Sequence, residues 1–361
     1  PQILGAIAIG SIIGWVAARR VQMTQMPQMV ALFNGVGGGA AAVISVIEFL
    51  SVESESIPIL TATIFTVVVG SVSFTGSLLT YAKLQELMTS RPVVIPLGRF
   101  ITIGIAVATI ATAVLLIVNP SNTLLWLLLN LSLVLGILLV LPVGGADVPI
   151  VISLLNAFTG LSVAASGYVL GNVLLIVAGT LVGASGTLLT RMMAKAMGRP
   201  LTNTLFGAFT AKASTSAASA EDRPVKSASP EDVAIMLGYA RKVIIVPGYG
   251  LAVAQAQNTI RELVELLVAK GIEVDYAIHP VAGRMPGHMN VLLAEANVPY
   301  EQLKEMDEIN PEFPSTDVAL VVGANDVVNP AARDDKTVPI YGMPILNVDQ
   351  AQQVVFLKRS M

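Results

Sequence analysis

The residues with the clearest chemical potential form a short glycine-rich turn. Gly248-Tyr-Gly250-Leu-Ala-Val253 follows the apolar run at 242–247 and leads into an amphipathic stretch at 251–270. Glycines at this spacing let the backbone turn tightly and approach a pyrophosphate at the amino terminus of a helix. The third position of the pattern holds Val253, where Gly or Ala is more common. The turn predicts a dinucleotide-binding loop, although the motif alone is a weak signal.

Other polar, glycine-rich segments accompany apolar runs that are typical of buried strands. Strands are expected at 242–247, 272–278, 317–322, 338–346 and 353–357. The polar segments are 279–288, 323–330, 341–343 and 358–361. Alternating strands and helices imply an α/β, Rossmann-like domain with a doubly wound parallel sheet, whose ligand lies at the carboxyl ends of the strands. We therefore expect these loops to form one nucleotide site.

The charges near the expected site favour NADP(H) over NAD(H). An NAD site usually places a carboxylate at the end of the second strand to accept from the ribose 2′-hydroxyl. Here that strand runs into His279 and then Arg284, and Asp275 lies earlier, inside the strand. Lys358 and Arg359 supply cations that would pair with a 2′-phosphate. The alternative for these two residues is an ordinary solvated terminus.

Several other chemistries are not supported by the residue types. The chain has no cysteine, so disulfides and thiolate metal sites are excluded. Its two histidines, His279 and His288, make neither a metal site nor a catalytic triad, and we favour loop residues satisfied by the backbone. A net charge of −3 without a basic cluster gives no footprint for nucleic acid.

The elements that precede this domain are too apolar for water. The 361 residues are 54% hydrophobic and 12% charged, with a mean hydropathy of +0.74. A bilayer core about 30 Å thick needs roughly 20 apolar residues in a helix. The stretches that meet this requirement predict a polytopic α-helical bundle of about seven spans: 2–18, 28–50, 57–82, 100–118, 123–142, 149–170 and 172–190.

The basic residues near the spans all fall on one side of the expected membrane. They are Arg19, Arg20, Lys83, Arg91, Arg99, Arg191, Lys195 and Arg199. The positive-inside rule makes that side cytoplasmic, or the equivalent matrix side, and places the C-terminal domain there. We expect a cell or inner membrane protein with a transmembrane domain at 1–200, a small-residue linker at 201–230 and the nucleotide domain at 231–361. Because the chain begins at Pro1, we expect its natural start to lie upstream.

The polar residues inside the spans are candidates for a proton pathway. Asn34 and Asn156 each lie seven residues into a span beside small residues, and the segments 27–34 and 149–156 resemble each other. This similarity predicts a parallel duplication, although short apolar matches also arise by chance. For Asn34 and Asn156 we favour ordered water over packing, and for Asn130 we favour a hydrogen bond to a neighbouring helix. Asp147 and Arg199 could relay protons at the cytoplasmic mouth or be solvated loop charges.

Taken with these motifs, the chain closely resembles the β subunit of the proton-translocating NAD(P) transhydrogenase over essentially its whole length. The most specific stretches are 247–257, 278–296, 305–310, 323–332 and 358–361. The resemblance implies that this chain binds NADP(H) and that a partner α subunit, with additional transmembrane helices, binds NAD(H). It also implies a dimer of the whole assembly.

Residues can be carried over from the family position by position. Those that would line NADP(H) are Tyr249, Val281, Ala282, Gly283, Arg284, Met285, Pro286, Gly287, Gly323, Ala324, Asn325, Asp326, Val327, Gly342, Met343, Lys358, Arg359, Ser360 and Met361. The resemblance gives the 2′-phosphate to Lys358, Arg359 and Ser360, and makes Asp326 the titratable coupling candidate. Some members have a membrane histidine implicated in proton passage where this chain has Asn34, which cannot titrate.

The expected reaction explains the lack of a catalytic acid or base. Direct hydride transfer between NAD(H) and NADP(H) exchanges no proton with water, so the protein has to position two nicotinamides and control when they meet. Proton movement would then act by shifting NADP(H) affinity. The alternatives are an ion or solute transporter regulated by a nucleotide-sensing domain, and a binding subunit without a catalytic role.

Overall fold

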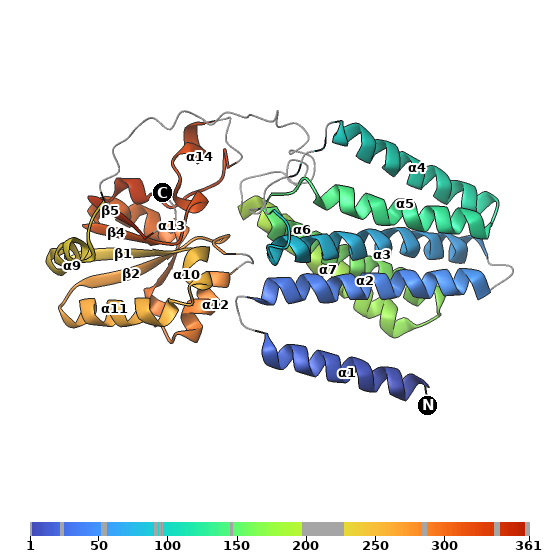
Figure 1. Ribbon diagram of the computed structural model, residues 1–361, viewed down its shortest axis with the longest axis horizontal. Helices are drawn as coiled ribbons and strands as arrows, with labels where there is room; N and C mark the ends of the chain where they lie inside the picture. Colours follow the sequence, from blue (N-terminus) through green and yellow to red (C-terminus); the bar gives the residue numbers. More distant parts are fainter. Residues whose placement is uncertain are drawn as a thin grey trace. The chain divides into compact units, whose positions relative to one another are not determined.

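The helical part of the chain consists of long apolar helices. The structure is a computed structural model that describes residues 2–21, 25–51, 56–89, 93, 95, 97–144, 147–196, 227–283, 287–335 and 340–357. Within these residues, seven helices are long and apolar enough to cross a membrane. They are α1 (Gln2–Arg20), α2 (Met26–Ser51), α3 (Ile57–Leu84), α4 (Gly98–Val118), α5 (Asn122–Val140), α6 (Val148–Val169) and α7 (Val173–Ala196), labelled in Figure 1. The expected set of spans is confirmed.

Proline and small residues explain where these helices begin and how closely they pack. Prolines stand near the starts of α2, α3 and α6, where no intrahelical hydrogen bond is lost. Between α2 and α3, a Cβ on Gly70 would lie 2.7 Å from the carbonyl oxygen of Gly38. Between α6 and α7, a Cβ on Gly160 would lie 2.5 Å from the backbone nitrogen of Gly183. These helix pairs therefore meet backbone to backbone, as small-residue interfaces in membranes do.

The second part of the chain contains a five-stranded parallel sheet. Its strands are β1 (Lys242–Pro247), β2 (Glu273–Ile278), β3 (Leu303–Glu305), β4 (Val318–Val322) and β5 (Gln353–Leu357), in the order β3-β2-β1-β4-β5. Every pairing is parallel. The order reverses between β1 and β4, so this is the position where a doubly wound sheet binds its ligand. The Rossmann-like fold class is confirmed.

The two faces of the sheet are covered differently. In β1, Val243 and Ile245 face one core and Ile244 and Val246 face the other. The first core is closed by α9 (Pro230–Tyr239), α11 (Gln257–Ala269) and α12 (His288–Glu295). The second is closed by α13 (Met306–Ile309), the 3₁₀ helix η5 (Asn310–Ser315) and the largely non-regular segment 340–350. Segment 340–350 is therefore held by isolated hydrogen bonds from side chains and from neighbouring loops, and not by a regular ladder.

Three local expectations differ from the structure. The helix expected at 251–270 is two helices, α10 (Tyr249–Val253) and α11, separated at Gln255, whose φ is +51°. The strand expected at 338–346 is wrong for the described residues 340–346, which form a turn and coil around Pro344. Proline has no N–H to give to a strand ladder, whereas the apolar side chains are buried as a strand's would be. The short edge strand β3 had not been expected.

Candidate functional site

The predicted glycine turn packs against the loop that follows β4. Gly250 donates its N–H to the carbonyl oxygen of Gly323 at 2.9 Å, and Gly248 donates to Val322 at 2.9 Å. Gly323 has φ +67°, and a Cβ on it would lie 2.5 Å from the Cα of Gly250. Only glycine fits this approach without displacing one of the two loops. The glycines therefore join the loops after β1 and β4 at the point where the strand order reverses.

The glycine turn is predicted to let the backbone approach a pyrophosphate. The N–H groups of Gly248 and Gly250 are hydrogen-bonded within the protein, so these two donors are not available for that role. Helix α10 is also only 5 residues long and contributes little dipole. Val253 ends α10 with its side chain 55% exposed, so it does not pack against the sheet as a third motif position would. The turn shapes the site mainly by bringing two loops together.

The loop after β2 is fixed by its buried histidines. Val281 donates its N–H to Nδ1 of His279 at 3.2 Å, so the ring hydrogen lies on Nε2, which donates to the carbonyl oxygen of Pro344 at 2.7 Å. Burial lowers the pKa of His279 from 6.5, and the bond to Pro344 opposes that shift. A Cβ on Gly283 would lie 2.5 Å from Nδ1 of His288, and the His288 ring lies 6.3 Å from that of Tyr249.

Both histidines are buried. His279 is a loop residue hydrogen-bonded to the backbone, as expected, whereas His288 is the first residue of α12 and not a loop residue. At the end of this loop Gly287 has φ +68° and precedes α12. Arg284, Met285 and Pro286 lie outside the described residues.

The remaining predicted nucleotide residues divide into buried and exposed sets. The side chains of Ala282, Ala324, Val327 and Met343 are buried in the core, so these residues could offer only backbone atoms to a ligand. Gly342, Asn325 and Asp326 are exposed at the surface. Asn325 donates to Asp326 at 3.0 Å. Lys358 to Met361 lie outside the described residues, directly after β5.

Because β1, β2 and β4 are parallel, the loops that follow them lie at the same end of the strands, which we call the carboxyl rim (described residues 248–253, 279–283, 287 and 323–330). Segment 340–350 is hydrogen-bonded to two of these loops. The rim brings together the predicted loops that the structure describes.

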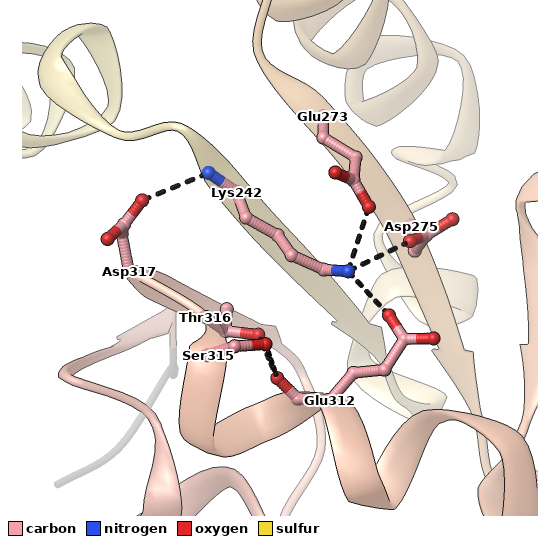
Figure 2. A network of polar contacts seen from close by, with 7 residues as sticks. All are labelled: Lys242, Glu273, Asp275, Glu312, Ser315, Thr316 and Asp317. Atoms are coloured by element: carbon pink, nitrogen blue, oxygen red, sulfur yellow. Dashed lines mark hydrogen bonds and ion pairs between the residues drawn. The ribbon is translucent and has the colours of Figure 1, made fainter.

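Asp275 belongs to an ion-pair cluster at the end of the strands opposite the carboxyl rim. Figure 2 shows the Lys242 ammonium among three carboxylates, at 2.8 Å from Glu273, 2.6 Å from Glu312 and 4.0 Å from Asp275. Burial alone would lower the pKa of Lys242, but its bonds to Glu273 and Glu312 raise it. Desolvation, together with the charge of Glu312, raises the pKa of Asp275.

The carboxylates of this cluster lie close enough together to suggest a cation site, and the lysine ammonium supplies that cation. Asp275 is thereby held near the starts of β1 and β2 and not at the carboxyl rim. It is therefore not placed to accept a ribose hydroxyl there.

Comparison with known proteins decides the family. A family model described as "NAD(P) transhydrogenase beta subunit" matches residues 1–361. The chain is also 47% identical over 366 aligned positions to "NAD(P) transhydrogenase subunit beta" of Rhodospirillum rubrum, covering 99% of this chain and 79% of that protein. A second match, from a named strain of the same species, gives the same values.

The chain belongs to the NAD(P) transhydrogenase beta subunit family. It is a multi-pass membrane protein of a hydride-transferring enzyme, and a beta subunit works with partner subunits. The predicted family and activity are confirmed.

In the membrane part of this transhydrogenase subunit, Asn34 lies in a buried polar cluster that joins three helices. Asn34 of α2 donates through Nδ2 to Ser77 at 2.9 Å and to Ser73 at 3.4 Å, both on α3. The Ser73 hydroxyl lies 2.6 Å from that of Thr159 on α6. Asn34 Oδ1 is buried without a partner among the residues that the structure describes. The sequence singled out Asn34 but not these hydroxyl partners, which lie 39, 43 and 125 residues away.

The other predicted pathway residues have different surroundings. Asn156 is half-buried on α6, three residues before Thr159, so the two are neighbours on one helix face. Asp147 is half-buried just before α6. Arg199 lies outside the described residues.

Two further membrane residues differ from their expected environments. Asn130 is exposed and donates to Trp126 of its own helix at 2.8 Å, so it does not link helices as had been expected. Lys83, expected between spans, lies in the last turn of α3. Its side chain is buried and donates to the carbonyl oxygen of Val140 at the end of α5, at 3.0 Å. A cation there complements the negative end of α5.

Proposed function

We propose that the α/β domain of this transhydrogenase subunit binds NADP(H) across its carboxyl rim. The observation that carries the proposal is the close approach of Gly250 to Gly323 at the strand-order reversal, where doubly wound sheets bind their ligands. The candidate lining residues that the structure describes lie on the loops around this point or on segment 340–350. The exposed Asp326 is the titratable candidate there.

Preference for NADP(H) over NAD(H) is supported by the placement of acidic groups. The carboxylate of Asp275 lies away from the carboxyl rim, 4.0 Å from the Lys242 ammonium near the other end of the strands. The residue after β2 is His279, a neutral donor to Pro344 and not a carboxylate. We assign the 2′-phosphate to Lys358, Arg359 and Ser360, because phosphate is best recognised by charge-assisted hydrogen bonds.

The reaction then needs two nicotinamides in contact and no acid or base from this chain. We propose that NAD(H) binds to the partner α subunit and that the assembly is a dimer of such complexes. The bound nucleotides supply the hydride chemistry, while the protein sets their orientation and excludes water. The domain would lie on the cytoplasmic or matrix side of an inner or cell membrane, as the distribution of basic residues indicates.

The polar cluster of Asn34, Ser73, Ser77 and Thr159 supports a route for protons between α2, α3 and α6. A buried amide oxygen without a protein partner can accept a hydrogen bond from water, and hydroxyls both donate and accept. One charge that crosses 100 mV supplies about 2.3 kcal/mol, which changes NADP(H) affinity by about fiftyfold if fully coupled. Asn156, Asp147 and Arg199 would extend the route.

Nucleotide binding is tested by calorimetry on the purified chain with NADP⁺ and with NAD⁺. We expect NADP⁺ to bind and NAD⁺ not to bind, and Arg359→Ala should weaken the binding of NADP⁺. Lys270→Ala is a matched control, because Lys270 lies between α11 and the start of β2, at the end of the strands opposite the carboxyl rim. Absence of heat with NADP⁺, or equal loss in both variants, would contradict the assignment.

Proton coupling is tested in vesicles that contain the chain and its α subunit. Asn156→Leu should abolish proton movement while NADP⁺ still binds. Asn130→Leu is the control, because that amide bonds only to its own helix among the described residues. Unimpaired pumping by Asn156→Leu would remove Asn156 from the route.

A further inference from the structure

Segment 340–350 packs on the sheet although no strand ladder holds it. Ile345 and Leu346 are buried in the second core, and Pro344 between two apolar residues has no N–H to donate. In the described residues of this segment, the backbone forms a turn, coil and the short 3₁₀ helix η7 (Val348–Gln350). Isolated contacts from elsewhere in the domain must therefore fix its position.

Asn310 meets this need with both ends of its carboxamide. Its Nδ2 donates to the carbonyl oxygen of Ile345 at 3.1 Å, and its Oδ1 accepts the N–H of Asn347 at 3.0 Å. A carboxamide carries the same donor and acceptor as a peptide group, so Asn310 takes the place of a neighbouring strand. Asn310 ends the 305–310 stretch, to which no function has been assigned.

The same segment is tied to the carboxyl rim by other contacts. His279 donates to the carbonyl oxygen of Pro344, and Leu346 donates its N–H to Val327 at 2.9 Å. Gly342 donates its N–H to Ala332 at 2.8 Å. The segment thus contacts the loops after β2 and after β4, and it carries Gly342 and Met343.

A salt bridge closes the far end of the segment. The Arg333 guanidinium of α14 (Ala331–Asp334) donates to both carboxylate oxygens of Asp349, at 2.8 and 3.0 Å, and also to the side chain of Asn347. Asn347 is therefore held from both sides, by Asn310 at its backbone and by Arg333 at its side chain.

We propose that Asn310 is a positioning residue for the NADP(H) site, acting through segment 340–350 to hold Gly342 and Met343 beside the rim loops. The proposal rests on the proposed function, because it needs these two residues to border the nucleotide. Asn310 would act without touching the nucleotide, because the two hydrogen bonds of its carboxamide go to the backbone of the segment. Loss of the amide frees the segment to leave its binding position, so only a fraction of molecules remains competent to bind.

The test uses the chain assembled with its α subunit and measures steady-state hydride transfer from NADPH to an NAD⁺ analogue. Asn310→Ala removes two hydrogen bonds, and we expect the KM for NADPH to rise about tenfold while the KM for the NAD⁺ analogue stays unchanged. Amide exchange in peptides that cover 340–350 should accelerate in the same variant, because the N–H of Asn347 loses its acceptor. Asn310→Asp keeps that acceptor but sets a carboxylate oxygen, which cannot donate, against the carbonyl oxygen of Ile345, so the same selective rise in KM for NADPH is expected and the test is maintained if the alanine variant does not accumulate.

Ser315→Ala is the matched control. Ser315 lies on the same 3₁₀ helix, and its hydroxyl donates to Glu312 and not to segment 340–350. Selective loss of NADPH affinity in the Asn310 variants but not in Ser315→Ala supports the proposal. Faster exchange with an unchanged KM for NADPH overturns it, as does an equal rise in both KM values. Failure of the wild-type assembly to bind NADP(H) would instead refute the proposed function, so the two failures are distinguishable.

Discussion

Alanine substitutions at three glycines separate backbone strain from close packing at the carboxyl rim and in segment 340–350. Gly342 has φ +80° with open space around a Cβ, so alanine there meets only the left-handed strain of about 1–2 kcal/mol. Gly248 has φ −127°, but a Cβ would overlap the backbone of Ala324. Such overpacking costs about 1–3 kcal/mol. Gly323 meets both problems, with φ +67° and a Cβ 2.5 Å from the Cα of Gly250.

The three costs lead to an ordered set of outcomes. We expect Gly323→Ala to lower the free energy of local opening by about 2–5 kcal/mol, the sum of the strain and overlap contributions. Gly248→Ala should show the overlap contribution alone. Gly342→Ala should lower stability only near 340–343 and leave β1 and β4 unaffected.

Amide exchange on the purified chain without nucleotide measures these effects, because the protection of β1 and β4 amides reports the free energy of opening that region. Omitting nucleotide matters, since a methyl group at Gly342 could also disturb a bound ligand. If Gly342→Ala exposed β1 and β4 as much as Gly323→Ala does, glycine-to-glycine packing would not be what joins the two loops. Full protection of β1 in Gly248→Ala would refute the overlap directly.

Three more predictions concern the Lys242 ion-pair cluster, His279 at the carboxyl rim and the helix bundle. Because the pKa of Asp275 is raised, ionisation of this carboxyl lowers the free energy of unfolding at neutral pH. Asp275→Asn should therefore raise that free energy by less than about 1 kcal/mol at neutral pH, and the gain should vanish as the pH falls towards 3.8. The pKa of His279 is lowered by burial, so neutral His279 contributes to the free energy of unfolding above pH 6.5, and this contribution is lost as the pH falls through the folded-state pKa. In thermal unfolding measured over a pH series, His279→Gln should remove that acid-dependent loss of stability. Gly136→Ala should destabilise the contact between α5 and α3 by about 1–3 kcal/mol in detergent, because the new methyl would overlap α3, whereas Gly104→Ala meets nothing within 4 Å and should be neutral.

The spans could be predicted from the sequence because the bilayer imposes a length and a composition on every helix. The run expected at 57–82 is the helix Ile57–Leu84, and the positions of β1, β4 and β5 agree within a residue. The break at Gln255 could not be foreseen, because neither Gly nor Pro marks it; the structure shows a left-handed glutamine there without a local sequence cause.

Segment 338–346 shows the limit of hydrophobic patterning. Its apolar residues are buried as expected, but burial does not require a ladder, and one of its backbone partners is the side chain of Asn310, which lies 35 residues from Ile345 and 37 from Asn347. Likewise, the sequence located the glycine turn but could not show that the N–H of Gly250 donates to the carbonyl oxygen of Gly323. Long-range partners of this kind, including Thr159 beside Asn34, have no local signature.

The glycine contact between α6 and α7 has a consequence for how the bundle could move. With Gly160 and Gly183 almost touching, and Gly179 similarly close to Ala164, a small slide of one helix along the other would drive side chains into backbone. These two helices are therefore expected to shift together as a single rigid body. The pair α2 and α3 is held in the same way by Gly38 and Gly70, whereas this pair meets α6 through the hydroxyls of Ser73 and Thr159, which can exchange partners by rotating about single bonds. Motion that accompanies turnover should therefore appear in cross-linking or spin-label distances between α3 and α6, and not within the pair α2 and α3 or the pair α6 and α7.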